Sequence, residues 1–339
     1  MSPHPFFLLA NGIGLLILRM KICVLDADTL GFDEAAWVGL GALGELEWHP
    51  ATKHSTEAVI ARAAEAEVVL TNKVPLRGDE FAALSELKLV SVLATGYNVV
   101  DLEAASARGV TVCNVPAYSS ASTAQHAVAL ILELCNQCGL HNQSVQAGDW
   151  IGSPHFCYWK KPLFGLTGRT VGLVGFGDIG RRVATILHAM GARIQACVRN
   201  PRNAPDWEGF RWVSREELFT TSDIVSLHCP ETPENHGFVN ADLLAGMKPG
   251  AMLVNTARGG LVDEAALADA LRGGHLAGAA VDVVSAEPMA ADNPLLGAPN
   301  CIITPHIAWA SEPSRRRLVD ISAENIKAFI SGKPQNVVT

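Results

Sequence analysis

The sequence predicts an α/β protein with two domains, each built on a parallel sheet. Its 339 residues are enough for two domains of ordinary size. Short β-rich runs alternate with helical patterns in residues 21–118 and again from Thr170, which is typical of parallel sheets covered by helices. Hydrophobic residues make up 49% of the chain and charged residues 18%, as in α/β proteins with many short loops.

The first alternation supplies one predicted sheet. The runs that predict its strands are residues 22–25, 68–71, 89–93 and 110–113. Residues 33–43 have a helical pattern, and a longer one covers residues 120–140, where Ser122 or Thr123 can cap the first turn. An irregular aromatic stretch follows, which we expect to pack at a subunit interface or against its own chain. Its aromatic residues are Trp150, Phe156, Tyr158, Trp159 and Phe164.

The second alternation begins at Thr170 and supplies a second sheet. Its predicted strands lie near residues 170–175, 193–198, 223–228, 252–257, 279–284 and 301–304. Strands in this number, with helices between them, fit a doubly wound nucleotide-binding domain. The last segment, residues 311–330, has a helical pattern that Gly332 is placed to end.

The charge pattern argues against a nucleic-acid partner. The formal net charge is −8 at pH 7, with no long run of one sign, whereas a nucleic-acid-binding protein normally carries a basic stripe. The short cluster Arg315-Arg316-Arg317 is interpreted as the solvated face of a helix.

Two features bear on the compartment. Residues 6–18 are apolar but fall short of a span of about 20 residues. They also lack the basic region and cleavage site of a secretory signal, so we expect no membrane association. We expect residues 1–19 to be a dispensable extension, with Met20 as the natural start of the fold. The eight cysteines are scattered, and the isolated Cys135-Asn-Gln-Cys138 has no second pair, so we expect reduced thiols, no metal site and a cytoplasmic location.

A glycine-rich turn predicts a dinucleotide site. The run Val174-Gly-Phe-Gly-Asp-Ile-Gly180 follows a predicted strand and opens a predicted helix, the context that this motif requires. Gly175 would allow the tight turn, Gly177 would let the backbone approach a pyrophosphate, and Gly180 would let the helix pack closely on the strand. The free N–H groups at the helix start would then face the phosphates. A glycine-rich turn that holds no ligand is the alternative.

The end of the next strand bears on the choice between cofactors. An acidic residue is expected roughly 20 residues after the turn, where it bonds the ribose 2′-hydroxyl. This chain has Val198-Arg199-Asn200 there, with no Asp or Glu. Neutral Val198 removes the repulsion of a 2′-phosphate, and Arg199, with Arg202 as a second candidate, could pair with it. The sequence therefore favours NADP(H), with NAD(H) possible; the alternative is that the arginines face solvent.

Three ionisable residues follow predicted strands and form a candidate reaction centre. Arg258, Glu287 and His306 come after the strands near 252–257, 279–284 and 301–304, and ligands of parallel sheets collect at the carboxyl ends of strands. Arg258 could clamp a carboxylate and stabilise a developing alkoxide, and His306 could deliver or take a proton. Glu287 could orient the imidazole and favour its protonated form. Taken singly, a surface Arg, a capping Glu and a core His are the alternatives.

At these residues the sequence resembles the D-isomer-specific 2-hydroxyacid dehydrogenases. The resemblance covers nearly the whole chain from Met20. The stretches that carry it are Val254-Asn-Thr-Ala-Arg-Gly-Gly-Leu-Val-Asp263, Asp282-Val-Val-Ser-Ala-Glu-Pro288 and Thr304-Pro-His-Ile-Ala-Trp-Ala-Ser311. Within the family, Thr71-Asn-Lys-Val74, Ala94-Thr-Gly-Tyr-Asn98 and the stretch from His306 to Ser311 look most like glycerate dehydrogenases, also called hydroxypyruvate reductases.

The resemblance implies a function and a domain plan. It implies hydride transfer between NAD(P)H and hydroxypyruvate or glyoxylate, giving D-glycerate or glycolate. It also implies a homodimer and a Rossmann-like cofactor domain at residues 119–306. A smaller flavodoxin-like lid domain would combine residues 20–118 with 307–339.

The resemblance further implies site residues. Arg258 would clamp the substrate, His306 would be the acid/base and Glu287 its partner. Substrate contacts would come from Lys73, Thr95, Gly96, Tyr97 and Trp309, although Trp309 could instead pack at a hinge. Besides the residues of the glycine turn and the 198–200 stretch, cofactor contacts would come from Asp178, Ile179, Cys229, Pro230, Asn235, Thr256, Ala257, Asp282 and Ala308.

Departures from the family pattern and other functions remain open. Val198 stands in place of the ribose acid, Gln125 where a Glu often precedes the helix residue His126, and Glu231 in a segment that is often apolar. Phosphoglycerate dehydrogenase is an alternative that would want extra cations for its phosphate, and formate and phosphonate dehydrogenases share the scaffold. An alternative of another class is a non-catalytic, NAD(H)-sensing protein similar to the corepressors built on this fold.

Overall fold

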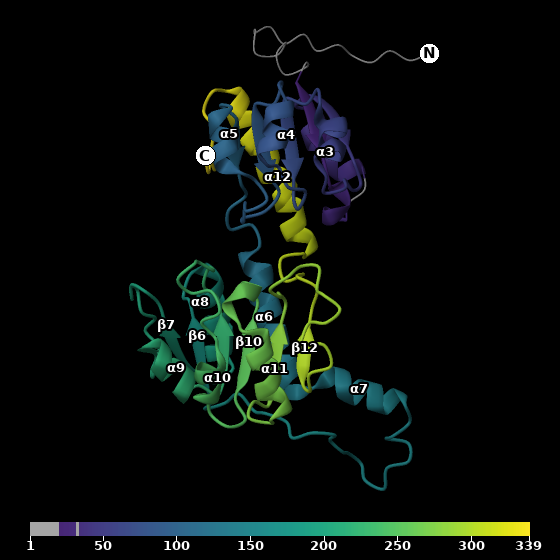
Figure 1. Ribbon diagram of the computed structural model, residues 1–339. Coiled ribbons are helices and arrows are strands. Elements are labelled where there is room, and N and C mark those ends of the chain that lie inside the picture. Colours follow the sequence, from purple (N-terminus) through teal and green to yellow (C-terminus); the bar gives the residue numbers. More distant parts are fainter. Residues whose placement is uncertain (1–19, 32–33) are drawn as a thin grey trace. The chain divides into compact units, whose positions relative to one another are not determined.

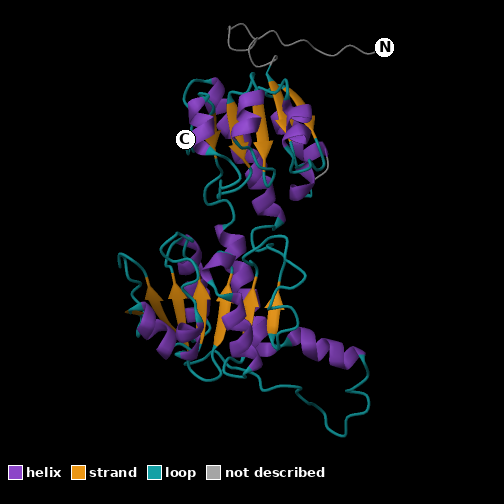
Figure 2. Ribbon diagram, in the orientation of Figure 1, coloured by secondary structure: helices purple, strands orange, loops and turns teal. Residues whose placement is uncertain are grey.

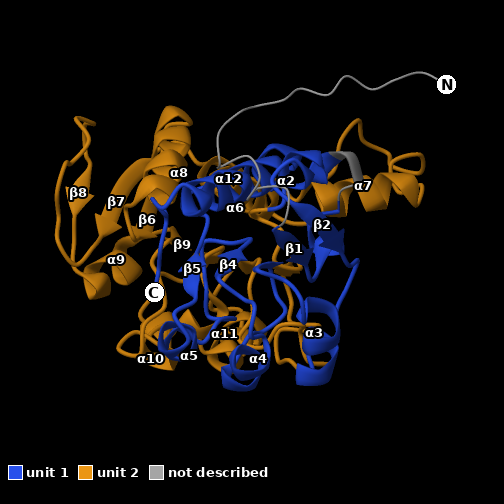
Figure 3. Ribbon diagram, turned by 90° about the horizontal axis from the view of Figure 1, so that it is seen from above, with its two compact units in different colours: residues 1–118, 310–339 blue, residues 119–309 orange. Residues whose placement is uncertain are grey.

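The computed structural model describes residues 20–31 and 34–339 and contains two compact units. Of the described residues, unit 1 contains those up to Tyr118 together with Ala310–Thr339, and unit 2 contains Ser119–Trp309; they are coloured blue and orange in Figure 3. The predicted extension, residues 1–19, lies outside the described residues. Both units are α/β, so the predicted fold class is confirmed (Figure 1, Figure 2).

Unit 1 has a parallel five-stranded sheet in the order β2-β1-β3-β4-β5, the order of flavodoxin-like folds. Its strands are β1 (Lys21–Val24), β2 (Glu45–Trp48), β3 (Val68–Thr71), β4 (Leu89–Val92) and β5 (Thr111–Cys113). Its helices are η1 (Ala27–Leu30), η2 (Glu34–Trp37), α2 (Val38–Gly41), α3 (Thr56–Ala63), α4 (Gly78–Ala83), α5 (Leu102–Ala107) and α12 (Glu312–Ile330). Every residue of β3 and β4 is buried, as expected for central strands covered on both faces.

Strand β2 was not predicted from the sequence. It reads Glu45-Leu-Glu-Trp48 and lies at the edge of the sheet, where its residues alternate between exposed and partly buried. A short edge strand that carries charges lacks the apolar run that marked the other strands. Its parallel pairing with β1 is therefore visible only in three dimensions.

Unit 2 has a parallel seven-stranded sheet in the order β12-β11-β10-β9-β6-β7-β8. Its strands are β6 (Thr170–Val174), β7 (Arg193–Cys197), β8 (Arg211–Trp212), β9 (Ile224–Leu227), β10 (Met252–Asn255), β11 (Gly278–Val281) and β12 (Cys301–Ile303). Its helices are α6 (Ser120–Asn136), α7 (Cys138–Gln146), α8 (Asp178–Ala189), α9 (Arg215–Thr221), α10 (Ala241–Ala245), η3 (Gly259–Leu261) and α11 (Glu264–Arg272). The direction of strand order reverses where β6 pairs with both β7 and β9, and ligands of doubly wound sheets bind at such a point.

The two faces of the unit 2 sheet bury separate cores. Val171 and Leu173 of β6 point into a core shared with α6 and α8, while Val174 belongs to the opposite core with α9, α10 and α11. Side chains of a strand alternate between faces, so helices on both sides explain the nearly continuous apolar runs. The two-residue edge strand β8 was missed in the sequence because it is too short to show a pattern.

The helix predicted over residues 120–140 is divided in two. Gln137 adopts the left-handed conformation, with φ of 48°, and ends α6, and α7 begins at Cys138. Cys135 is buried in the core, whereas Cys138 is exposed on α7. The two thiols of the C-x-x-C spacing therefore lie on different helices.

Candidate functional site

The glycine turn of unit 2 has the geometry that a pyrophosphate requires. Gly175 has φ of 98°, and a Cβ there would lie 2.5 Å from the carbonyl oxygen of His228, so only glycine fits. A Cβ on Gly180 would lie 2.4 Å from the carbonyl oxygen of Gly175, because α8 packs closely on the turn. Gly177, by contrast, faces open space, with no described atom within 4 Å of its ideal Cβ.

The start of α8 is left free for an anion. Its N-cap residue is Gly177, which has no side chain that could accept hydrogen bonds from the first N–H groups of the helix. Asp178 lies in this turn, but its carboxylate accepts a hydrogen bond from Ser120 and pairs with Arg182 at 3.1 Å. These bonds, led by the one from Ser120, lower the pKa of Asp178. The helix therefore offers free N–H groups at the positive end of its dipole.

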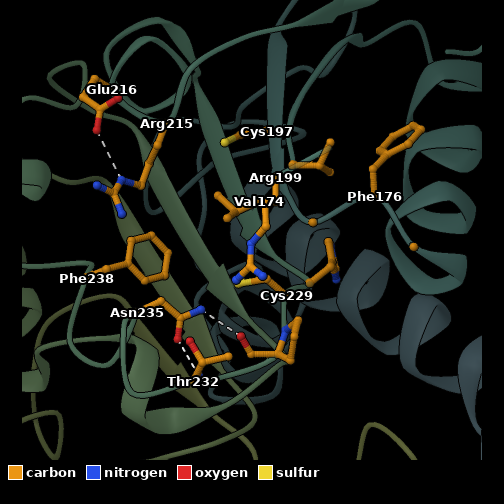
Figure 4. A pocket seen from close by; sticks show the side chains of 15 residues that line it. Val174, Phe176, Cys197, Arg199, Arg215, Glu216, Cys229, Thr232, Asn235 and Phe238 are labelled. Carbon is orange, nitrogen blue, oxygen red and sulfur yellow. Dashed lines mark hydrogen bonds and ion pairs between the residues drawn. The ribbon is translucent and has the colours of Figure 1, made fainter. Parts of the chain in front are cut away.

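A cavity of about 760 Å³ adjoins this turn (Figure 4). It is formed by residues at the carboxyl ends of β6, β7 and β9 together with the start of α9. The predicted cofactor residues that line it are Gly175, Gly177, Val198, Arg199, Cys229, Pro230 and Asn235. The lining residues that sequence reasoning missed are Val174, Phe176, Cys197, Arg215, Glu216, His228, Thr232 and Phe238.

Two arginines line this cavity. Arg199 is exposed and points into it from the end of β7, and Arg215 enters from the first turn of α9 (Figure 4). Arg215 pairs with Glu216 at 3.3 Å and lies over the ring of Phe238 at 5.5 Å from its centroid. Arg202 does not line the cavity; its carbonyl accepts a hydrogen bond from Arg181. The cavity thus offers guanidinium groups where an NAD site would have a ribose-binding acid.

The other predicted cofactor residues lie outside this cavity's lining. Asp178, Ile179 and Gly180 form the first turn of α8, and Asn200 is exposed beyond Arg199. Ala257 and Ala308 are buried in loops after β10 and β12. Thr256 is also buried, and its hydroxyl has no hydrogen-bond partner in the described part of the chain. A buried hydroxyl without a partner is unusual, and the Thr256 hydroxyl is therefore available to bind a polar ligand at this loop.

A second cavity brings the three ionisable residues together. It measures about 210 Å³, and Arg258, Glu287 and His306 all line it. Nδ1 of His306 lies 2.6 Å from Oε2 of Glu287, and Oε1 of Glu287 accepts the N–H of Val284 at 3.3 Å. Both side chains are about one-third exposed, at 30% and 36%, so solvent and small ligands can reach them. The pair leaves Nε2 as the imidazole nitrogen that can exchange a proton.

The turn that carries His306 is held by Asp282. The Asp282 carboxylate is 1% exposed and accepts N–H groups from Ile307 at 2.9 Å and Ala308 at 2.8 Å. It also accepts the hydroxyl of Thr304 at 2.5 Å. His306 has φ of 53°, a left-handed conformation that an L-residue with a bulky side chain adopts only when its surroundings impose it.

The loop of Arg258 is braced in a similar way. Asn255, at the end of β10, donates from Nδ2 to the carbonyl of Arg258 at 2.8 Å and accepts the N–H of Ala257 at 3.0 Å. Gly259 packs so closely on the next loop that a Cβ would lie 2.0 Å from the carbonyl carbon of Val284. The backbone is thereby fixed, while Arg258 is exposed as a residue and its Nη1 donates to the carbonyl of Ala257 at 2.6 Å.

The same cavity contains a second carboxylate–imidazole pair that the sequence did not predict as part of the site. Glu231 and His236 line it, with His236 Nδ1 2.8 Å from Glu231 Oε1. The Glu231 carboxylate packs against Gly260, and a Cβ at that position would lie 2.1 Å from Oε1. Glu231 stood out in the sequence only as a departure from the family pattern.

Candidate substrate residues of unit 1 lie on two neighbouring loops. Lys73 follows β3, and Thr95, Gly96 and Tyr97 follow β4, which pairs with β3 in parallel. Thr95 is tied down at both ends, since its hydroxyl donates to Val115 at 2.8 Å and its carbonyl accepts from Asn114 at 2.8 Å. In unit 2, Trp309 is half-buried at the end of the unit.

Within residues 20–31 and 34–339, no three His, Cys, Asp or Glu side chains are grouped as metal ligands would be. None of the helices in those ranges has both the length and the apolar character to cross a membrane.

The doubly wound sheet, the glycine turn and the two cavities define a dinucleotide-binding oxidoreductase, and comparison with known proteins gives its family. Residues 128–308 match the NAD binding domain of the D-isomer specific 2-hydroxyacid dehydrogenases. A hydroxypyruvate reductase of Blautia hydrogenotrophica is 45% identical over 320 residues, covering 94% of this chain and 99% of the relative. The chain belongs to the D-isomer specific 2-hydroxyacid dehydrogenase family, as its motifs predicted.

Two further relatives support the family assignment. A glycerate dehydrogenase of Methylorubrum extorquens is 41% identical over 296 residues, covering 87% of this chain and 90% of the relative. An NADPH-dependent glyoxylate/hydroxypyruvate reductase from Sinorhizobium meliloti, solved with NADP and malonate, superposes with a TM-score of 0.80. It is 30% identical, and the match covers 95% of this chain and 97% of that one.

Proposed function

We propose that this protein reduces a small 2-oxo acid, hydroxypyruvate or glyoxylate, to D-glycerate or glycolate. The observation that carries the proposal is the 2.6 Å contact between His306 and Glu287 in a cavity that Arg258 also lines. Hydroxypyruvate reductase and glycerate dehydrogenase are the activities named for the relatives that are 45% and 41% identical. A positioned acid/base and a cation for the substrate carboxylate are what this reaction needs.

Each residue of the site has a separate role in the proposed reduction. NAD(P)H held at the glycine turn would supply the hydride that the carbonyl carbon accepts. The Arg258 guanidinium holds the substrate carboxylate and stabilises charge on the carbonyl oxygen through charge-assisted hydrogen bonds. As the carbonyl π electrons move to that oxygen, Nε2 of His306 gives it a proton; oxidation reverses the transfer. Glu287 keeps the imidazole oriented through Nδ1. In unit 1, Lys73 and the Thr95–Gly96–Tyr97 loop supply further contacts to the substrate.

The proposed cofactor is NADP(H). The cavity beside the glycine turn has Val198 where an acid would repel a 2′-phosphate, and Arg199 and Arg215 are available to pair with that phosphate. The free N–H groups of α8 would hold the pyrophosphate. The solved reductase with 30% identity is NADPH-dependent, which supports the same preference.

The proposed assembly is a homodimer. After α7, the chain exposes several large apolar side chains, among them Ile151 at 92%, Phe156 at 89% and Trp159 at 66%. Exposed apolar area of this kind marks interaction surfaces. Phe164 and Tyr158 of the same stretch instead make contacts within unit 2: Phe164 packs on its core, and the hydroxyl of Tyr158 lies 2.8 Å from that of Ser144. Light scattering on the wild type and on Phe156→Ser/Trp159→Ser tests the proposal, which a monomeric wild type would overturn.

A spectrophotometric screen tests the reaction. Hydroxypyruvate, glyoxylate, pyruvate and 3-phosphohydroxypyruvate are each offered with NADPH and with NADH, and oxidation of the cofactor is followed. We expect the highest kcat/KM with hydroxypyruvate or glyoxylate and NADPH. No turnover of any of these substrates with either cofactor would refute the function, and a preference for 3-phosphohydroxypyruvate would favour phosphoglycerate dehydrogenase.

A further inference from the structure

Unit 1 contains a buried carboxylate that the proposed mechanism does not use. Asp26 follows β1, is 3% exposed, and accepts the backbone N–H groups of the three consecutive residues after β3. The N–H of Asn72 lies 2.9 Å from Oδ1, and the N–H groups of Lys73 and Val74 lie 2.6 and 3.2 Å from Oδ2. Such charge-assisted bonds are stronger than neutral ones and fix all of this short turn at once.

The turn held by Asp26 presents Lys73. Asn72 and Val74 are buried on either side, while Lys73 is exposed. The hydroxyl of Thr71 donates to the carbonyl of Val74 at 2.7 Å and closes the turn from within. The N–H of Leu93 donates to the carbonyl of Thr71 at 2.8 Å, which joins this turn to the strand that leads into the Thr95–Tyr97 loop. A displacement of the turn would therefore displace the proposed substrate contact of Lys73.

The side chain of Asn72 does not help to stabilise the turn. Asn72 is 3% exposed, and its Nδ2 finds no acceptor within the described residues. An unpaired buried amide disfavours the arrangement, so stabilisation must come from elsewhere. The Asp26 carboxylate provides it, although burial raises the pKa of this group in spite of the three N–H bonds. The turn is thus held by a charge that the interior disfavours.

We infer that Asp26 is a positioning residue for the 2-oxo acid: by binding the N–H groups of residues 72–74 it fixes the backbone that carries Lys73, the residue proposed to contact the substrate. The inference rests on the proposed function, because Lys73 contacts substrate only if the protein acts on a 2-oxo acid. Asp26 itself touches no substrate. If the Asp26 carboxylate served only the fold, its replacement would lower the stability of the protein and leave the KM for the 2-oxo acid unchanged.

The variant Asp26→Asn tests the inference, because it keeps the shape but replaces one acceptor oxygen with a donor that faces N–H groups. We expect the KM for hydroxypyruvate to rise about tenfold or more, since small misplacements of a binding group are costly. The KM for NADPH should stay within about twofold, because the cofactor cavity belongs to unit 2. The matched control is Glu80→Gln, another buried carboxylate of unit 1 that accepts a backbone N–H, from Arg77 at 2.8 Å.

A double-mutant cycle separates positioning from general damage. If Asp26 acts through Lys73, Asp26→Asn should raise the KM for hydroxypyruvate much less in the Lys73→Ala background than in the wild type. Fully additive effects, or an unchanged KM in folded Asp26→Asn, would overturn the inference. If the wild type turns over no 2-oxo acid, the proposed function fails before the variant is measured.

Hydrogen exchange of the wild type provides a test that needs no variant. The amides of residues 72–74 should exchange as slowly as those of β3, although Lys73 is exposed, because their hydrogens are bound to a buried carboxylate. Exchange of these amides at the rate of an unprotected loop would overturn the inference even if Asp26→Asn does not fold.

Discussion

The backbone N–H of His306 donates to the carbonyl of Asp282 at 2.8 Å, so the end of β11 sets the place of the imidazole at the end of β12. The Asp282 carboxylate then binds the N–H groups of the two residues that follow His306. His126 of α6 reaches the same carboxylate at 3.4 Å. These bonds hold His306 in its left-handed conformation, with φ of 53°. The buried Asp282 therefore determines the backbone geometry of the proposed acid/base.

We predict that Asp282→Asn lowers kcat about tenfold to a hundredfold, because one oxygen that accepts a backbone N–H becomes a donor and the turn of His306 shifts. Steady-state kinetics with hydroxypyruvate and NADPH measure the change. Asp263→Asn is the control, since Asp263 caps α11 by accepting the N–H of Ala266 at 3.0 Å. That control should change stability little, because Asn caps a helix about as well as Asp, and should leave kcat unchanged. Equal kcat values for the two variants would contradict the role given to Asp282.

We predict that His306→Gln lowers kcat by about a hundredfold to ten-thousandfold, the usual contribution of a positioned acid/base. Its affinity for NADPH, measured by fluorescence titration, should stay close to that of the wild type. Glu287→Gln should lose less, because the amide oxygen can still accept from Nδ1 and only the carboxylate charge at 2.6 Å from the imidazole is removed. His188→Gln is the control, since His188 stacks on Trp207 away from both cavities. Turnover of His306→Gln at the wild-type rate would remove His306 from the mechanism.

The parts of the site that could be predicted from the sequence are those with a local signal. Gly175, Gly177 and Gly180 lie within one turn, and the strand–turn–helix context of that turn is readable from neighbouring residues. Arg258, Glu287 and His306 could be placed because parallel strands end at one edge of a sheet, and the structure brings all three to one cavity.

The parts that could not be predicted depend on packing between distant segments. Arg215 lines the dinucleotide cavity from a different βα unit than Arg199, and nothing near it in the chain marks it as a ligand residue. Glu231 and His236 join the second cavity only because their loop packs on Gly260. The sequence indicated only that Asp282 contacts the cofactor. In the structure its carboxylate accepts hydrogen bonds from Thr304, Ile307 and Ala308, and no local pattern in the sequence reveals these bonds.

We predict that Arg199→Ala lowers kcat/KM for NADPH about tenfold to a hundredfold, the value of a lost hydrogen bond to a charged group, and leaves the value for NADH unchanged. The ratio of kcat/KM for the two cofactors is the measurement. Arg202→Ala is the matched control, because Arg202 does not line the cavity and should leave the ratio unchanged. Arg215→Ala should lower the ratio less, because the Arg215 guanidinium is already paired with Glu216 and stacked on the ring of Phe238. An unchanged ratio in Arg199→Ala would show that this arginine faces solvent.

The last prediction concerns stability at low pH and the wall of the dinucleotide cavity. Burial lowers the pKa of His228 to about 4, and its Nε2 lies 2.9 Å from the hydroxyl of Ser226. The folded protein therefore resists protonation of a ring that the unfolded chain protonates near its ordinary pKa of about 6.5. Stability from this group is complete above that pH and falls as the pH drops from about 6.5 towards 4.

The expected loss between about pH 7.5 and about pH 5 is of the order of 2 kcal/mol from His228 alone. Urea unfolding of the wild type and of His228→Asn, both without added dinucleotide, measures it as the difference in their pH dependence. His155→Asn, at an exposed histidine outside the cavity, should keep the pH dependence of the wild type. The variant His228→Asn should lose less stability on acidification than the wild type, because it has no ring to protonate on unfolding. Identical pH profiles for the wild type and His228→Asn would show that the imidazole titrates alike in the folded and unfolded chains.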